Sequence, residues 1–241
     1  MRYVIFSDIH AYPKALKNVL EDIAGKQVDR TICLGDIVGF GPDPAGAVEM
    51  CRILDVCVSG NNDEELVSLC GSGTVAADSA NVVSREQILW LSQLPKIYAQ
   101  DTFICTHKKF EQRDGIVVPG FGYLFRPEDA DESLDATSGN YRIAFVGHTH
   151  EPCVWDRDET VGVGSIFSEA KSFTLKEGHR YVVNVGTVGY PRHSGCSSYV
   201  IYDDQAGTLD FCHLQFDFAE YLRSFECAIM DAPQWVKERV L

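Results

Sequence analysis

The sequence lacks long apolar runs. Nowhere in its 241 residues do about 18 uncharged apolar residues follow one another, which disfavours a membrane-spanning helix. The first segment is a short hydrophobic run that ends at Asp8. It has neither the long apolar region nor the small-residue cleavage site of a signal peptide. We therefore expect a first strand here and no membrane partner.

Cysteine is frequent, but its spacing lacks any pairing pattern. The chain has nine cysteines, an odd number, and no C-x-x-C pair. Several of them, including Cys33, Cys57 and Cys105, lie within apolar segments, where a free cysteine behaves as a small hydrophobic residue. We expect neither a disulfide framework nor a zinc finger, and we predict a reduced, cytoplasmic protein.

Positive charge is scarce. Lysine and arginine number 21 against 35 aspartates and glutamates, which gives a formal net charge of −14. A surface this acidic repels nucleic-acid backbones and anionic membranes. The charge therefore disfavours a nucleic-acid polymer as substrate, and any phosphate chemistry would depend on bound cations acting locally.

The first half of the chain alternates apolar segments with helical patterns. Such an order favours a largely parallel sheet with helices outside it. Asp43 before Pro44 is a predicted helix cap, and Pro95 is a predicted helix stop. The predicted strands span 2–6, 30–35 and 55–60, and the predicted helices span 12–25, 43–54 and 79–94.

The second half is richer in strands. We find no repeat, no low-complexity tract and no convincing linker, so we expect one α/β domain over residues 1–241 with two sheets packed face to face. The glycine-rich segment 108–128 is predicted to be a long surface loop. Strands are predicted at 102–106, 142–147, 152–156, 172–175, 180–186, 198–203 and 208–216, followed by a helix at 218–230.

Residues that can bind metals follow five of the predicted strands. In parallel α/β sheets, sites form at the carboxyl ends of the strands, so these residues are expected to meet at one rim. A mixture of oxygen and imidazole ligands suits Zn, Fe, Ni or Mn better than Ca. The residues are Asp8, His10, Asp36, Asn61, His107, His148 and His150.

Seven ligands exceed the need of one ion and are about right for two. Two metals roughly 3.5–4 Å apart are the arrangement that proteins use to attack phosphate esters. Asp36 is the natural bridge, because a carboxylate has two oxygens and Asp36 lies between the other residues in sequence order. By contrast, His179 and His213 have no such partners and are read as ordinary structural residues.

Five short motifs contain these residues. Each motif is weak alone, but they follow one another at the ends of predicted strands. They are D-x-H (Asp8, His10), G-D-x-x-x-x-G-P (Gly35, Asp36, Gly41, Pro42), G-N-x-D (Gly60, Asn61, Asp63), T-H (Thr106, His107) and G-H-T-H (147–150).

In this order the motifs resemble those of calcineurin-like metallophosphoesterases. The stretches "ICLGDIVGFGPDP" and "VNVGTVGYPR" look like the bacterial phosphodiesterase branch, and the resemblance covers roughly residues 2–203. It implies a four-layer αββα fold, in which two mixed β-sheets pack as a sandwich flanked by helices. It also implies a hydrolase of phosphoester bonds.

The resemblance further implies how the seven residues share two divalent metal ions. A hydroxide that bridges the two ions would be the nucleophile, because bound cations lower the pKa of water. The metal stays open among Mn, Fe, Zn and Ni, since affinity order and availability decide occupancy. Position by position, Asp8, His10 and His150 would hold one ion, Asn61, His107 and His148 would hold the other, and Asp36 would bridge them.

Two positions depart from the family pattern. Many relatives have a histidine where this chain has Asn62, and that histidine is thought to protonate the leaving oxygen. Asparagine has no titratable proton near neutral pH, so the departure favours phosphodiesters or esters with good leaving groups. Lys108 and Lys109 follow His107, where small residues are usual, and Lys108 is a candidate phosphate contact.

For several other residues the sequence is compatible with either a functional or a purely structural role. Arg192 is either a phosphate clamp or part of a polar loop, and the adjacent His193 is either a substitute acid or an ordinary loop residue. Asp63 is expected to hold a loop or a ligand in place. Phe121, Tyr123 and Phe125 would line a pocket for a base or aryl group, or simply cover the core. The predicted catalytic set is Asp36, Asn62, Asp63 and Arg192, with substrate contacts from Asn62, Lys108 and Arg192.

The function predicted from these patterns is that of a metal-dependent phosphodiesterase acting on a small phosphoester. A phosphomonoesterase, a protein phosphatase or a dinucleoside polyphosphate hydrolase is the enzymatic alternative. A non-catalytic, protein-binding scaffold with the same fold is the alternative from another class, and the complete set of seven ligands argues against it. The sequence leaves the substrate, the metal and the oligomeric state open.

Overall fold

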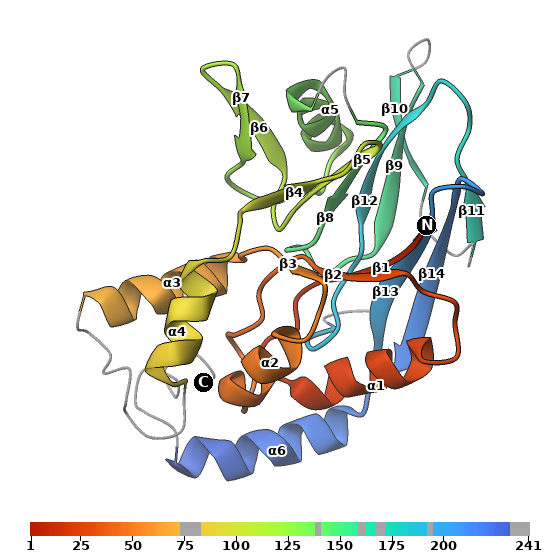
Figure 1. The fold of residues 1–241 in the computed structure, drawn as a ribbon. Helices are drawn as coiled ribbons and strands as arrows, with labels where there is room; N and C mark the ends of the chain where they lie inside the picture. The colour runs from red at the N-terminus through yellow and green to blue at the C-terminus, as the bar shows by residue number, and fades with distance from the viewer. Residues whose placement is uncertain (73–82, 138–140, 159–161, 167–171, 192–194, 232–241) are drawn as a thin grey trace.

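Two six-stranded sheets form the centre of the computed structural model of this protein (Figure 1). The structure describes residues 1–72, 83–137, 141–158, 162–166, 172–191 and 195–231. Both sheets mix parallel and antiparallel strands, and six helices and a two-stranded hairpin complete the described part. The predicted fold class, an α/β protein with two mixed sheets, is therefore confirmed.

The first sheet joins a parallel half to an antiparallel half. Its parallel strands come from the N-terminal residues, and its antiparallel strands come from the C-terminal part of the chain. The sheet order is β11 (Ser172–Thr174), β14 (Thr208–Gln215), β13 (Cys196–Asp203), β1 (Arg2–Phe6), β2 (Arg30–Cys33) and β3 (Val56–Cys57).

The second sheet has three parallel strands at its centre and antiparallel strands at both edges. Its order is β10 (Gly162–Ile166), β9 (Cys153–Asp158), β12 (Arg180–Asn184), β8 (Ile143–Val146), β5 (Phe103–Thr106) and β4 (Ile97–Ala99).

Three apolar clusters separate four layers. One cluster lies between the two sheets, a second lies between the first sheet and its helices, and a third lies between the second sheet and a single helix. The helices on the first sheet are α1 (Pro13–Ile23), α2 (Pro44–Cys51), α3 (Asn61–Gly71), α4 (Arg85–Ser92) and α6 (Phe218–Asp231), and α5 (Pro127–Ala136) covers the second sheet (Figure 1).

The continuously apolar sequence of β1 is explained by the burial of both faces of this strand. Val4 and Phe6 face the helices, whereas Tyr3 and Ile5 face the second sheet. Successive side chains of a strand point to opposite faces, and both faces of this strand are covered. An apolar run that stops abruptly at Ser7 and Asp8 therefore marks the end of a central strand and the start of a polar rim.

The prediction of a long loop over 108–128 was wrong. Strands β6 (Phe110–Arg113) and β7 (Ile116–Pro119) form a hairpin there, and α5 begins at Pro127. Asp114 and Gly115 connect the strands with φ of 52° and 79°. Two consecutive positive φ values are the mark of the tight turn that suits the twist of a hairpin, and Asp-Gly is its usual sequence. That local signal was present and was overlooked.

Helices α3 and α4 also differ from the predictions. The α3 helix, which starts at Asn61, was not predicted. Helix α4 starts at Arg85 rather than at residue 79, because Ser84 accepts a hydrogen bond from the amide of Gln87 at 3.2 Å and ends the extended segment. Residues 79–82 of the predicted helix lie outside the described residues.

Membrane insertion finds no support among the helices that the structure describes, since none is both long and apolar enough to span a bilayer. The cysteines whose side chains are described are all free thiols, in agreement with the expectation of no disulfide framework.

Candidate metal centre

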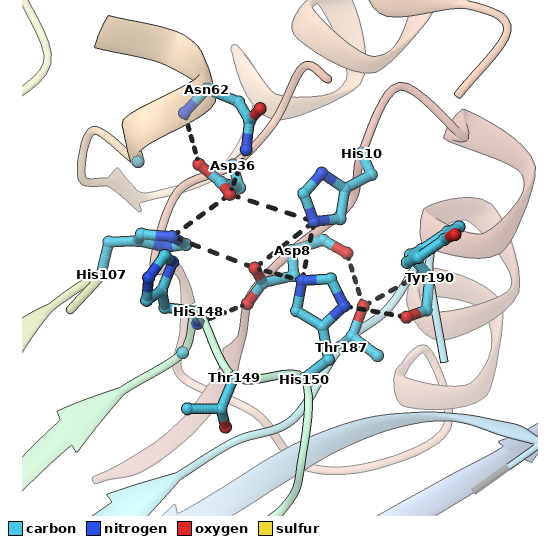
Figure 2. A network of polar contacts seen from close by, with 12 residues as sticks. Asp8, His10, Asp36, Asn62, His107, His148, Thr149, His150, Thr187 and Tyr190 are labelled. Carbon is cyan, nitrogen blue, oxygen red and sulfur yellow. Dashed lines mark hydrogen bonds and ion pairs between the residues drawn. The ribbon is translucent and has the colours of Figure 1, made fainter. Parts of the chain in front are cut away.

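The ends of five strands converge on one polar cluster (Figure 2). The residues concerned follow β1, β2, β3, β5 and β8, which belong to both sheets. The backbone turns sharply where the strands end, and several residues there have left-handed conformations that are uncommon outside glycine and tend to cluster at functional sites. These residues are Asp8 (φ 58°), His10 (48°), Asp36 (50°), His148 (68°) and His150 (65°).

Glycines allow the loops after the strands to approach one another closely. A Cβ atom on Gly60 would overlap with the backbone nitrogen of Asp36, and one on Gly147 would overlap with the hydroxyl of Ser7. Only glycine leaves room for these two contacts. The two glycines therefore allow the loops after four strands, β1 with β8 and β2 with β3, to lie directly against one another.

The first group of possible ligands consists of Asp8, His10 and His150. The Nε2 atom of His150 lies 3.1 Å from Oδ1 of Asp8, and the Nε2 atom of His10 lies 3.5 Å from the same oxygen. The two Nε2 atoms are 2.9 Å apart. These distances place the polar atoms of the three side chains in one small volume. All three side chains are also buried.

The second group consists of Asp36, His107 and His148. The Nε2 atom of His107 lies 3.3 Å from Oδ2 of Asp36. The two groups adjoin, because Oδ2 of Asp36 lies 3.9 Å from His10 Nε2 and Oδ1 of Asp8 lies 4.0 Å from His107 Nε2. Asp8, Asp36 and His150 thus meet in one cluster, although up to 142 positions separate them in the sequence.

The hydrogen bonds of two histidines define which ring nitrogen faces the cluster. Nδ1 of His107 lies 2.9 Å from the carbonyl oxygen of Leu34, and Nδ1 of His150 lies 3.0 Å from that of Tyr190. A carbonyl only accepts, so Nδ1 carries the proton in each ring. In the neutral ring, Nε2 then directs its lone pair into the cluster, which is the arrangement of a metal-binding histidine.

Several buried atoms of the cluster have no hydrogen-bond partner. Asp8 Oδ1, Asn61 Oδ1 and His107 Nε2 are among them. Buried polar atoms of this kind are costly unless something satisfies them. Carboxylate, amide and imidazole atoms are also the donors that divalent transition metals accept. The residues present therefore fit a cation on the chemistry of the donors and on their unmet hydrogen-bonding capacity.

The charges of the cluster reinforce one another. Burial opposes the ionisation of Asp36, but the imidazoles of His107 and His10 outweigh it and lower the pKa of Asp36 to about 2. Burial likewise opposes the charge on His107, yet Asp36 and Asp8 raise the pKa of His107 to about 9. Without metal, the cluster thus consists of carboxylates balanced by a protonated imidazole.

His148 behaves differently. Burial, followed by the charge on His107, lowers the pKa of His148 to about 4. Its ring is neutral near pH 7 and needs no deprotonation before it can bind an ion. The backbone amide of His148 also donates to Oδ2 of Asp8 at 3.0 Å, so this ligand loop is anchored to β1.

Asn62 and Asp63, at the start of α3, hold parts of the cluster and its loops in place. The backbone amide of Asn62 donates to Oδ1 of Asp36 at 2.8 Å, and its side-chain amide donates to Oδ2 at 2.6 Å. Asp63 accepts from the amides of Val38 at 3.0 Å and Gly60 at 2.9 Å. Burial and the nearby Asp36 raise the pKa of Asp63 to about 7. Both residues hold neighbours in place in this structure.

Of the other residues considered in the sequence analysis, some lie near the cluster and others do not. Lys108 lines a cavity next to His107, whereas Lys109 turns away to an ion pair with Glu132 at 2.8 Å. Arg192 and His193 lie outside the described residues. His179 pairs with Asp156 at 2.6 Å, in keeping with the structural role expected for it.

Sequence reasoning missed residues that position the cluster. The side chain of Asn184 donates to the carbonyl of Gly147 at 2.7 Å, and the hydroxyl of Thr187 donates to the carbonyl of Asp8 at 2.8 Å. Tyr123, which the sequence analysis names as a candidate pocket residue, stacks on His148 with ring centroids 4.4 Å apart and an interplanar angle of 11°. Asn184 and Thr187 lie within "VNVGTVGYPR", so the likeness of that stretch to the family was the available signal.

Comparison with known proteins identifies the family of this chain. The model of the calcineurin-like phosphoesterase superfamily domain matches residues 1–207. The chain belongs to this superfamily. Members use divalent metals, which agrees with the donor set assembled at the strand ends.

Individual relatives agree with this membership. An uncharacterized protein of Methanocaldococcus jannaschii is 29% identical over 251 residues, covering 98% of this chain and 96% of the relative. The crystal structure of a metallophosphoesterase from Sphaerobacter thermophilus matches with a TM-score of 0.78 and 27% identity, covering 100% of this chain and 98% of that one. A hypothetical protein of Pyrococcus horikoshii shares the fold, with a TM-score of 0.67, 15% identity and coverage of 99% and 97%.

Proposed function

We propose that this protein hydrolyses phosphodiesters with two divalent metal ions held at the strand ends. The observation that carries the proposal is the pair of adjoining ligand groups, close to each other through Asp8 and Asp36, in which several buried atoms, among them Asp8 Oδ1 and His107 Nε2, lack hydrogen-bond partners. Neither a structural network nor a protein-binding surface needs such an arrangement, because unmet buried atoms cost stability.

The proposed assignment follows the two groups. Bound together, two divalent ions supply an activated water near neutral pH and stabilise the charge that develops on the phosphoryl oxygens. Under this proposal Asp8, His10 and His150 hold one ion, Asn61, His107 and His148 hold the other, and Asp36 serves both.

The role proposed for the protein's own residues is to hold the donors still. The carbonyls of Leu34 and Tyr190 fix the rings of His107 and His150, and Asn62 clamps both oxygens of Asp36. Partners of this kind orient the ligands and make the site rigid before the substrate arrives.

The preference for diesters rests on Asn62. Its amide cannot donate a proton to a leaving oxygen near neutral pH, and in this structure it is bonded to Asp36. When the P–O bond of an aryl diester breaks, the leaving group is a stable phenolate that needs no acid, whereas an alkyl monoester loses an alkoxide that must be protonated. The solved archaeal phosphodiesterase that shares this fold, with a TM-score of 0.51 at 17% identity, supports the fold alone. The small phosphoester substrate and the cytoplasmic location stay predictions.

A substrate pair tests the proposal. The purified protein is freed of metal, reloaded with Mn²⁺ and assayed against bis(p-nitrophenyl) phosphate and p-nitrophenyl phosphate, and bound metal is counted by mass spectrometry. We expect two ions per chain and faster turnover of the diester. Two bound ions without turnover of either ester would refute catalysis and favour the scaffold. Faster turnover of the monoester would refute the diester preference.

A further inference from the structure

A cavity of about 310 Å³ opens beside the second ligand group. Its lining comes from the β6–β7 hairpin and the residues that follow it, the N-terminal part of α3, the residue before β4 and the end of β5. His107 and Asn61 belong both to its lining and to the proposed metal centre. The cavity and the cluster are therefore contiguous at these two residues.

The lining of the cavity is basic, in contrast to the chain as a whole. Lys96, Lys108 and Arg113 line it, and Glu64 is the acidic residue among them. The whole chain has a net charge of −14, so three cations around one small space are a local reversal of sign. Clefts lined by one sign of charge concentrate ligands of the opposite sign.

The three cations differ in how far they are already paired. Lys96 lies 2.8 Å from Glu64, and Arg113 lies 2.8 Å from Glu111. Within the part of the chain that the structure describes, no carboxylate forms an ion pair with Lys108. The N-terminal end of α3 adds partial positive charge at the same wall. The cavity thus keeps an excess of positive charge that the protein itself does not neutralise.

Arg113 has two partners next to the cavity. Its guanidinium lies 4.6 Å from the ring centroid of Phe121, and Phe121 is 73% exposed although it is a large apolar residue. Glu111 accepts from both Arg113 and the backbone amide of Phe121, at 2.8 and 2.7 Å. The hairpin thus presents a planar cation at the cavity, and an arginine fork suits phosphate or carboxylate oxygens.

We propose that this cavity binds a second anionic group of the substrate, a phosphate or carboxylate separate from the ester that is cleaved. The inference rests on the proposed phosphodiesterase function and narrows its substrates to phosphodiesters with additional negative charge. The volume is at the lower end of that of small-molecule sites, enough for a phosphate and a short linker. Lys108 and Arg113 are the residues that would contact this group.

A matched pair of substrates tests the inference. The first is thymidine 5′-(p-nitrophenyl phosphate), and the second is the same compound with a 3′-phosphate. The quantity to compare is the ratio of kcat/KM for the second substrate to that for the first, measured with the Mn²⁺-loaded protein. We expect a ratio of about ten or more, since a charge-assisted contact changes affinity by roughly that factor. The ratio does not depend on the fraction of folded enzyme.

Three variants locate the effect. Lys108→Gln and Arg113→Gln should each lower the ratio at least fivefold. Lys17→Gln, which removes the same charge from the exposed face of α1, should leave it unchanged. A native ratio near one, ratios in the first two variants equal to the native ratio, or an equal fall in Lys17→Gln would each overturn the inference. Absence of turnover with both substrates would instead overturn the proposed function.

Discussion

The two ligand groups differ in how far each is enclosed. Asp8 and His10 have no exposed surface. The ring centroids of Phe40 and Tyr190 lie 4.7 and 6.0 Å from the ring centroid of His10. His107 and Asn61, in contrast, line the cavity, and His148 is only partly buried. One half of the centre is closed by packed side chains, and the other half borders open space.

The two halves therefore suit different roles. An ion held by enclosed donors should exchange slowly with solvent and stay with the protein. An ion held by donors that border a cavity can bind a substrate oxygen as a further ligand, and a catalytic site needs such an open position. We infer that substrate reaches the centre from the side of His107.

The largest effect is expected at the residue common to both halves. Asp36→Asn should lower kcat for the aryl diester by at least about 10³-fold and release at least one ion per chain, because an amide is a poor bridge. Activity and metal content of the purified variant check this. The matched control is Asp101→Asn, an exposed carboxylate on a distant loop, which should change neither quantity. Native metal content and activity in Asp36→Asn would show that the centre is assigned wrongly.

The enclosed and open halves should release metal at different rates. When excess chelator is added to the metal-loaded protein, we expect metal to be released in two kinetic phases whose rates differ at least about tenfold. His148→Ala should remove the fast phase, and His150→Ala should remove the slow one, since each histidine belongs to a different group. Stopped-flow with a coloured chelator measures both phases. A single phase in the native protein would contradict the contrast between the halves.

Metal binding to the open half should depend on pH through His107. Its pKa is raised from 6.5 to about 9, so the metal-free protein keeps a proton on this ring at pH 7. An ion requires the neutral ring, and its binding expels that proton. Affinity should therefore rise about tenfold per pH unit between pH 7 and 9 and level off above.

Calorimetric titration in two buffers of different ionisation enthalpy counts the protons released. About one proton from His107 should be lost in total at pH 7 as the metal-free protein takes up its ions. His148, whose pKa is lowered to about 4, should contribute none at that pH. Binding without proton release would show that His107 is neutral before the ion arrives.

A smaller effect is expected at Asn62. Asn62→His restores a proton donor near the cluster, so it should raise monoester relative to diester turnover several-fold. Because p-nitrophenolate leaves without an acid, the monoester for this test is an alkyl one, glycerol phosphate, and its kcat/KM is divided by that of bis(p-nitrophenyl) phosphate. Because Asn62 also bonds to Asp36, Asn62→Ala is the control for loss of that bond alone. An equal ratio in the histidine and alanine variants would dismiss the proton-donor explanation.

The smallest effect concerns the hairpin that bounds the open half. Gly115 has φ of 79° and no atom within 4 Å of an added Cβ, so Gly115→Ala introduces backbone strain alone. It should lower the free energy of unfolding by about 1 kcal/mol and Tm by a few degrees. Gly25→Ala, equally open but without positive φ, should be neutral or slightly stabilising. Equal melting temperatures for the two variants would contradict the turn geometry.

Prediction from sequence succeeded where the signal was local. The apolar runs before Asp8, Asp36 and His148 defined central strands, because both faces of those strands are covered and only apolar residues fit. The same runs stop where the chain reaches the polar rim. Order and spacing along the chain were thus enough to bring the candidate ligands to one edge of the fold.

Prediction failed where local signals were weak or were read too coarsely. The hairpin at 110–119 has an Asp-Gly turn, but it lies in a glycine-rich segment, and glycine content alone favours a loop. Helix α3 starts at Asn61, where no helix is predicted, and its sequence is largely polar. Both differences affect the site, since residues of the hairpin and of α3 line the cavity beside His107.

The strand ends, the donor atoms and the glycines between them follow from residue type and spacing, which act over a few positions. The enclosure of some donors, the hydrogen bonds from Asn62 to Asp36, and the position of Lys108 and Arg113 on one cavity follow from the folded arrangement. These relations join residues from elements far apart in the chain, and packing of the two sheets and the hairpin sets them.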